Sequence, residues 1–121
     1  MADAQTENTS ILGSVKHALG IEDDVDVWDS DLIMFINAVF GTLYQIGVGP
    51  PTPFTIDGDT QEWSEFTVRD DVEMVKSYMY QKVRLLFDPP TVTTMYQALD
   101  TVTKELEWRL NVAVDTGVQN G

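Results

Sequence analysis

The chain has 121 residues, no cysteine and a formal net charge of −13 at pH 7. This length suits one domain, and the lack of cysteine excludes disulfides, thiolate nucleophiles and zinc–thiolate sites. The charge repels nucleic acid and anionic membranes, and the basic patch of a conventional DNA-binding protein is missing. Lys16 and Arg69 are the only Lys or Arg residues before Lys76, whereas most of the acids lie in that stretch. We therefore expect an acidic globular protein that neither binds DNA specifically nor enters a membrane.

The first third of the sequence predicts a tail, a short helix and an acidic loop. Residues 1–9 are polar and lack the basic start of a signal peptide, so we expect a flexible N-terminal tail there. Apolar residues at helical spacing predict a helix over 11–19. Six acids then lie within residues 22–31. We interpret them as a solvated loop in which Asp29 or Ser30 caps the next helix.

A second helix is predicted over 31–46, followed by a long irregular loop over 47–62. Prolines and glycines exclude a helix in the loop, although residues 54–56 are apolar enough for a short strand. Loops of this length are uncommon inside small domains and are often functional. We expect this one to form an interface and to become ordered on assembly. Its candidate contact residues are Pro50, Pro51, Pro53, Phe54, Asp57 and Asp59.

A third helix is predicted over 69–87, and it carries apolar residues on two faces. Besides the main stripe, Met74, Tyr78 and Leu85 form a second apolar strip at the helical step of about 100° per residue. A helix that is apolar on two faces either lies at the centre of its bundle or sits at an interface with another molecule. The three residues of the second strip are therefore candidate interface residues.

The segment "LLFDPP" ends that helix at Phe87. Pro89 drives Asp88 out of the helical region and Pro90 extends the break, while Phe87 is expected to anchor the corner. A fourth helix follows over 93–112. The chain is thus predicted to be all-α: a small four-helix bundle over residues 10–112 with a flexible tail over 113–121.

Trp108 lies on a polar face of the fourth helix, beside Arg109. A large aromatic side chain in that position suggests contact with another molecule. The alternative is that the first helix or the long loop covers it. Two pairs at i,i+4 spacing, Asp100–Lys104 and Glu105–Arg109, are expected to support the helix by a few tenths of a kcal/mol each.

The sequence contains no pattern typical of a catalytic or metal site. His17 is the single histidine, so no second imidazole is available to it. An EF-hand loop starting at Asp24 would need glycine and glutamate where Asp29 and Phe35 stand. Phosphate-binding, dinucleotide-binding and nucleophile-elbow motifs are missing too. We predict no enzymatic activity, no cofactor and no metal.

Four segments together resemble the head–tail connector proteins, also called head-completion or adaptor proteins, of long-tailed bacteriophages. They are "ILGSVKHALGI" at 11–21, "DLIMFINAVFGTLYQIGVG" at 31–49, "VKSYMYQKVRLLFDPP" at 75–90 and "ELEWRL" at 105–110. The corner and the last segment are the most specific parts. The residues that match the family pattern there are Phe87, Asp88, Pro89, Pro90, Glu107, Trp108 and Arg109.

The resemblance implies a small helical bundle without catalytic activity. It implies copies that assemble into a twelve-fold ring under the portal ring of the DNA-filled head, after synthesis in the host cytoplasm. Such a ring extends the DNA channel, lets DNA pass without specific binding, and offers a docking surface for the next connector or tail component. The acidic charge and the two apolar faces of the third helix fit this picture.

Two other function classes stay open at this stage. An acidic protein that mimics DNA and inhibits a basic host protein would explain the charge, but its acids should be spaced regularly along one surface. Here they cluster in a loop and at helix starts. An enzyme whose site forms between subunits would need a carboxylate with a perturbed pKa in a pocket.

Overall fold

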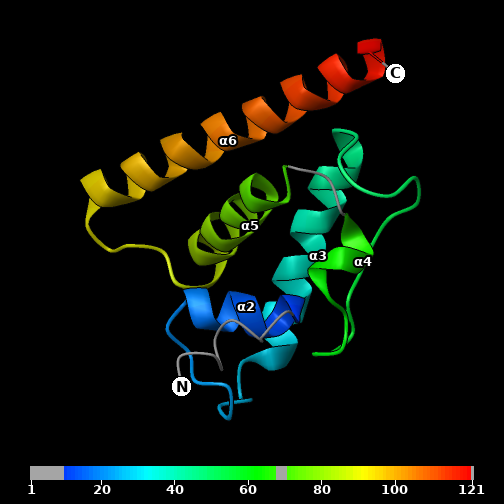
Figure 1. Ribbon diagram of the computed structural model, residues 1–121. Helices are drawn as coiled ribbons and strands as arrows, with labels where there is room; N and C mark the ends of the chain where they lie inside the picture. The colour runs from blue at the N-terminus through cyan, green and yellow to red at the C-terminus, as the bar shows by residue number, and fades with distance from the viewer. Residues whose placement is uncertain (1–9, 68–70, 121) are drawn as a thin grey trace.

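The computed structural model describes residues 10–67 and 71–120, and within them the chain is all-helical (Figure 1). The five helices are α2 (Ile11–Ala18), α3 (Asp29–Gln45), α4 (Trp63–Phe66), α5 (Val72–Phe87) and α6 (Thr93–Asn120). The described residues contain no strand, only an isolated antiparallel bridge between Ser10 and Glu62. This confirms the all-α prediction. The predicted tail at 1–9 lies outside the described residues.

Helix α5 is the central element, because it packs against α3 on one side and α6 on the other (Figure 1). Its main stripe supplies the fully buried residues Val75, Met79 and Val83. On another face, the Tyr78 hydroxyl donates to Glu107 Oε1 of α6 at 3.3 Å. Both apolar faces are therefore covered within one chain, which favours the central-helix alternative.

Helix α2 holds the acidic loop against the body. Ser10 caps the helix by accepting a hydrogen bond from the Gly13 amide at 2.9 Å. The Lys16 side chain, 5% exposed, lies 3.0 Å from Asp29 Oδ1 and also donates to the Asp23 carbonyl at 3.2 Å. Burying an ammonium group is costly without such partners, so this pair fixes where the loop enters α3.

The start of α3 differs from the prediction. The helix begins at Asp29, and the residue at the cap position is Trp28, whose side chain makes no capping hydrogen bond. Asp29 and Asp31 lie instead inside the first turn. Their charges are favourable there because the amide groups of a helix N-terminus carry partial positive charge.

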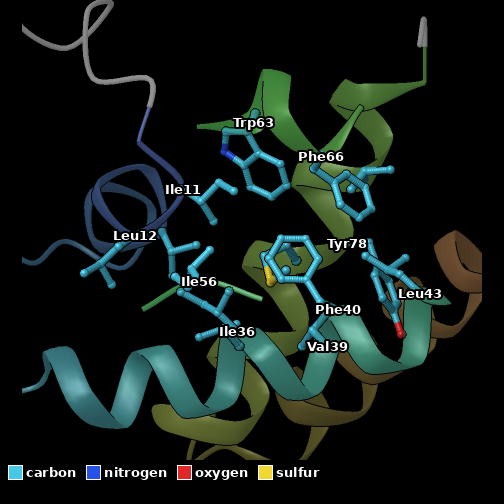
Figure 2. Close-up of a cluster of buried hydrophobic side chains, with 14 of the residues drawn as sticks. Ile11, Leu12, Ile36, Val39, Phe40, Leu43, Ile56, Trp63, Phe66 and Tyr78 are labelled. Atoms are coloured by element: carbon cyan, nitrogen blue, oxygen red, sulfur yellow. The ribbon is translucent and has the colours of Figure 1, made fainter. Parts of the chain in front are cut away.

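An aromatic cluster fills the core between α3, the long loop and α4 (Figure 2). The Phe40 ring is central, with ring centroids of Phe54, Trp63 and Phe66 at 5.0, 6.0 and 4.9 Å. Such tilted and edge-on pairs stabilise a core by about 0.5–1.5 kcal/mol each beyond their buried area. The cluster ties the loop after α3 to the body of the protein.

The loop over 47–62 leads into a short helix, α4, and residues 54–56, which are apolar enough for a short strand, form none. Asn37 of α3 takes the place of a neighbouring strand: its Oδ1 accepts from the Ile56 amide at 2.8 Å, and its Nδ2 donates to the Ile56 carbonyl at 2.9 Å. These bonds, together with the 97% buried Ile56 side chain, anchor the loop. The expectation that it orders only on assembly was therefore wrong, because a single chain already supplies its packing.

Helix α6 continues to Asn120, past the predicted end at Val112. Leu110 is fully buried and Val114 packs against the core, so packing on the body supports helix beyond Val112. The predicted tail at 113–121 is consequently helical as far as Asn120. The domain limits at 10 and 112 stay a prediction.

We predict that Asn37→Ala lowers the free energy of unfolding by about 2 kcal/mol, since the Ile56 amide and carbonyl lose their partners in a largely buried position. Chemical denaturation would measure the change. Thr42→Ala, elsewhere on α3, should change stability by less than about 0.5 kcal/mol, because the Thr42 hydroxyl bonds only weakly to its own helix, at 3.5 Å from the Ala38 carbonyl. Equal stability of wild type and Asn37→Ala would contradict the anchoring role of Asn37.

Candidate interface surfaces

The corner after α5 is held by aromatic contacts. The Phe87 ring is half-buried and meets Trp28 edge-on at 5.7 Å and Phe35 at 6.5 Å between centroids. Asp88 leaves the helical region with φ −146° and ψ 66°, as its place before Pro89 predicts. Phe87 is thus an anchor, as expected. Trp28 is the partner that sequence reasoning missed, because nothing local links the two residues.

Asp88, Pro89 and Pro90 lie at the surface of this corner. Asp88 and Pro89 are exposed and Pro90 is half-buried. Leu86, next to Phe87, is also partly exposed. The corner therefore presents a polar and apolar surface to solvent, and its role as a contact stays a prediction.

Trp108 is 64% exposed, so no described element covers it. Arg109 beside it pairs with Glu105 at 2.6 Å, and Lys104 pairs with Asp100 at 3.1 Å. Both pairs match the predicted i,i+4 spacing. The alternative that α2 or the long loop covers Trp108 is excluded for the described residues, and its contact with another molecule stays a prediction.

The second apolar strip of α5 lies inside the chain. Tyr78 is fully buried, and its burial raises the pKa of the phenol above the ordinary value, as does the adjacent negative charge of Glu107. The hydroxyl therefore stays protonated and keeps donating to Glu107. Met74 and Leu85 are half-buried on the same helical face. Tyr78 thus contacts α6 of its own chain, which corrects the expectation that it meets a neighbouring molecule, whereas the interface role of Met74 and Leu85 stays a prediction.

The candidate residues of the long loop divide into two groups. Phe54 is half-buried in the aromatic cluster, and Pro50 is half-buried four residues earlier in the loop. The other four candidates face solvent: Pro51, Pro53, Asp57 and Asp59. Asp57 also accepts a hydrogen bond from Gln61 at 2.8 Å. The exposed side of the loop is therefore held by the packing of Phe54 and by the hydrogen bond between Gln61 and Asp57. The interface role of the loop stays a prediction.

A polar depression of about 270 Å³ lies between α2 and the acidic loop. Lys16, Asp23, Asp29 and Asp59 line it, and the Lys16 ammonium group already balances Asp29. Across the described residues, no group of three or more His, Cys, Asp or Glu side chains is placed to hold a metal ion. None of the described helices combines the length and the apolar character that crossing a membrane requires.

Comparison with known proteins places the chain in a family. The family model described as phage connector protein matches residues 11–117 and so spans every described helix except the last residues of α6. The chain therefore belongs to the phage connector protein family. Searches of curated proteins and of solved structures gave no match. The family is structural and not enzymatic, so the protein has a structural connector role in a bacteriophage.

Proposed function

We propose that the protein is a head–tail connector whose copies form a twelve-fold ring under the portal, extend the DNA channel and provide a docking surface for tail components. The observation that carries this proposal is the family match over residues 11–117. It covers the helical core and the corner after α5 as one unit. The proposal places the protein in the virion, at the joint between head and tail.

The charge distribution supports a channel through which DNA slides. Lys16 is the only Lys or Arg among residues 10–67, and it is buried against Asp29. Cations that contact phosphates add salt-dependent affinity for DNA. The part of the surface that residues 10–67 form therefore offers no unpaired Lys or Arg to the phosphates of passing DNA, whereas the exposed Arg84, Lys104 and Arg109 lie on α5 and α6.

The acidic-inhibitor alternative receives less support from the structure. Five exposed acids lie within the ten residues 22–31, namely Glu22, Asp23, Asp24, Asp26 and Asp31, and Asp29 there is paired with Lys16. This is a local cluster rather than a row of carboxylates spaced like phosphates. A mimic would bind its basic partner less tightly as salt rises.

The role of Trp108 gives a specific prediction. Trp108→Ala should change the free energy of unfolding by less than about 0.5 kcal/mol, since the side chain is mostly in solvent. It should weaken binding to the portal or to neighbouring copies roughly tenfold or more, as expected for a tryptophan at the centre of an interface. Denaturation and a pull-down with portal rings would measure the two effects. Unchanged assembly and binding would remove Trp108 from the interface.

Removing the gene from the phage tests the proposed function. We expect heads and tails to accumulate unjoined, because the part that links them is missing, and a plasmid copy of the gene should restore infectious particles. Electron microscopy of the lysate reads out the result. Normal joined particles made without the protein would contradict the connector role.

A further inference from the structure

The first turns of α6 project from the body of the protein (Figure 1). Residues 91–98, here named the α6 arm, are all exposed, and they include Met95, which is 59% exposed, and Tyr96. Farther along the same helix Thr103 and Leu110 are buried. The described part of the chain therefore covers the middle of α6 but leaves its beginning uncovered.

The arm continues the face by which α6 packs on the body. Tyr96 precedes the buried Thr103 by about two helical turns, so the two residues lie on the same side of α6. The apolar face thus extends beyond the point where the chain's own core ends. Apolar side chains on a helix in register with a buried face are typical of packing against another element.

The arm is also free of charge in a protein with a net charge of −13. Residues 89–99 contain no charged side chain, and neither do residues 32–56, which form most of α3 and the first part of the loop. We name the exposed part of this second segment the α3 surface; its members include Met34, Ala38, Tyr44, Gln45, Pro51 and Pro53. Two copies of an acidic protein repel each other, so they meet at lowest cost where both surfaces lack charge.

The two uncharged surfaces lie on different sides of the molecule. In Figure 1 the beginning of α6 lies at the left edge, whereas the end of α3 and the following loop lie at the right. A contact between two different surfaces is heterologous, and it repeats from copy to copy until a ring closes. When two copies are joined in this way, one copy still has a free α6 arm and the other still has a free α3 surface, so further copies can be added at both ends.

We infer that the α6 arm of one copy docks on the α3 surface of the next copy. The inference rests on the proposed ring, to which it adds the surfaces that join its subunits. Met95 and Tyr96 supply the apolar contacts, and Met34, which is 58% exposed, and Tyr44 receive them. Neither surface brings a carboxylate of its own segment into the contact.

Crosslinking through introduced cysteines tests this contact, because the chain has no cysteine of its own that could link two copies. Met95→Cys is combined with Met34→Cys in one variant and with Tyr44→Cys in another; all three side chains are exposed, so the fold should be kept. Each variant is assembled on portal rings of its phage and treated with a short bismaleimide. We expect at least one double variant to give a ladder of trimers and longer species on a denaturing gel, whereas single variants give at most dimers.

The matched control combines Met95→Cys with Val27→Cys, since Val27 is 68% exposed but lies among the acids before α3. We expect no ladder from it. Rings seen by electron microscopy without ladders from either test variant, or with equal ladders from the control, would overturn the inference and leave the proposed function standing. A wild-type protein that forms no ring on intact portals would overturn both.

Discussion

Gly49→Ala should lower the free energy of unfolding by about 3 kcal/mol. Gly49 has a φ of +103°, where a residue with a side chain is strained by about 1–3 kcal/mol. A Cβ atom built there would also lie 2.5 Å from Cε1 and 2.6 Å from Cζ of Phe66. The Phe66 ring is buried among other rings, so it has little room to move, and such overpacking costs about 1–3 kcal/mol more.

Chemical denaturation followed by tryptophan fluorescence would measure this effect. Gly58→Ala is the matched control in the same loop, since a Cβ at Gly58 meets no atom within 4 Å and its φ is not in the left-handed region. The control should stay within about 0.5 kcal/mol of wild type. If both variants unfold at the same denaturant concentration, the close approach of the loop to Phe66 is wrong.

Phe40→Ala should lower the free energy of unfolding by about 4 kcal/mol, which is near the middle of the range for deleting a buried aromatic ring. Phe40 is 1% exposed and touches the rings of Phe54, Trp63 and Phe66. Its removal leaves a cavity where α3, the loop and α4 meet. Since small domains are stable by only about 5–15 kcal/mol, the variant should be close to unfolding.

Met34→Ala serves as the control for Phe40→Ala, because Met34 lies on the exposed face of the same helix. It should change stability by less than about 0.5 kcal/mol. Thermal unfolding by circular dichroism compares the two variants. Similar melting temperatures for both would show that the aromatic cluster does not hold the loop to α3.

Local signals in the sequence were enough to predict the ends of some helices. Pro89 determines the end of α5 at Phe87, since the ring of a proline acts on the residue directly before it. Helix α6 begins at Thr93 as predicted, after the same break. The continuation of α6 past Val112 was not predictable in this way, because Leu110 and Val114 support it by packing on the body.

Features that depend on contacts between residues far apart in the chain could not be predicted from the sequence. The apolar run at 54–56 indicates a strand only if another strand lies beside it, but its partner is the side chain of Asn37 on a helix. The spacing of apolar residues likewise predicts two apolar faces on α5, but it does not indicate which element packs against the second face. The position of α6, which brings Glu107 to Tyr78, decides it.

The candidate interface was partly predictable. Trp108 stands out because its helical face is polar, and the structure leaves it exposed. The uncharged segments at 32–56 and 89–99 can be read from the sequence. Their positions on different sides of the molecule cannot, since these follow from how α3 and α6 pack around α5.

The most direct test of the connector function is to mix the purified protein with intact portal rings of its own phage and image the mixture by electron microscopy. We expect a second ring stacked on the portal, present only when this protein is added. Portal rings that stay bare, at protein concentrations well above those expected during assembly, would contradict it.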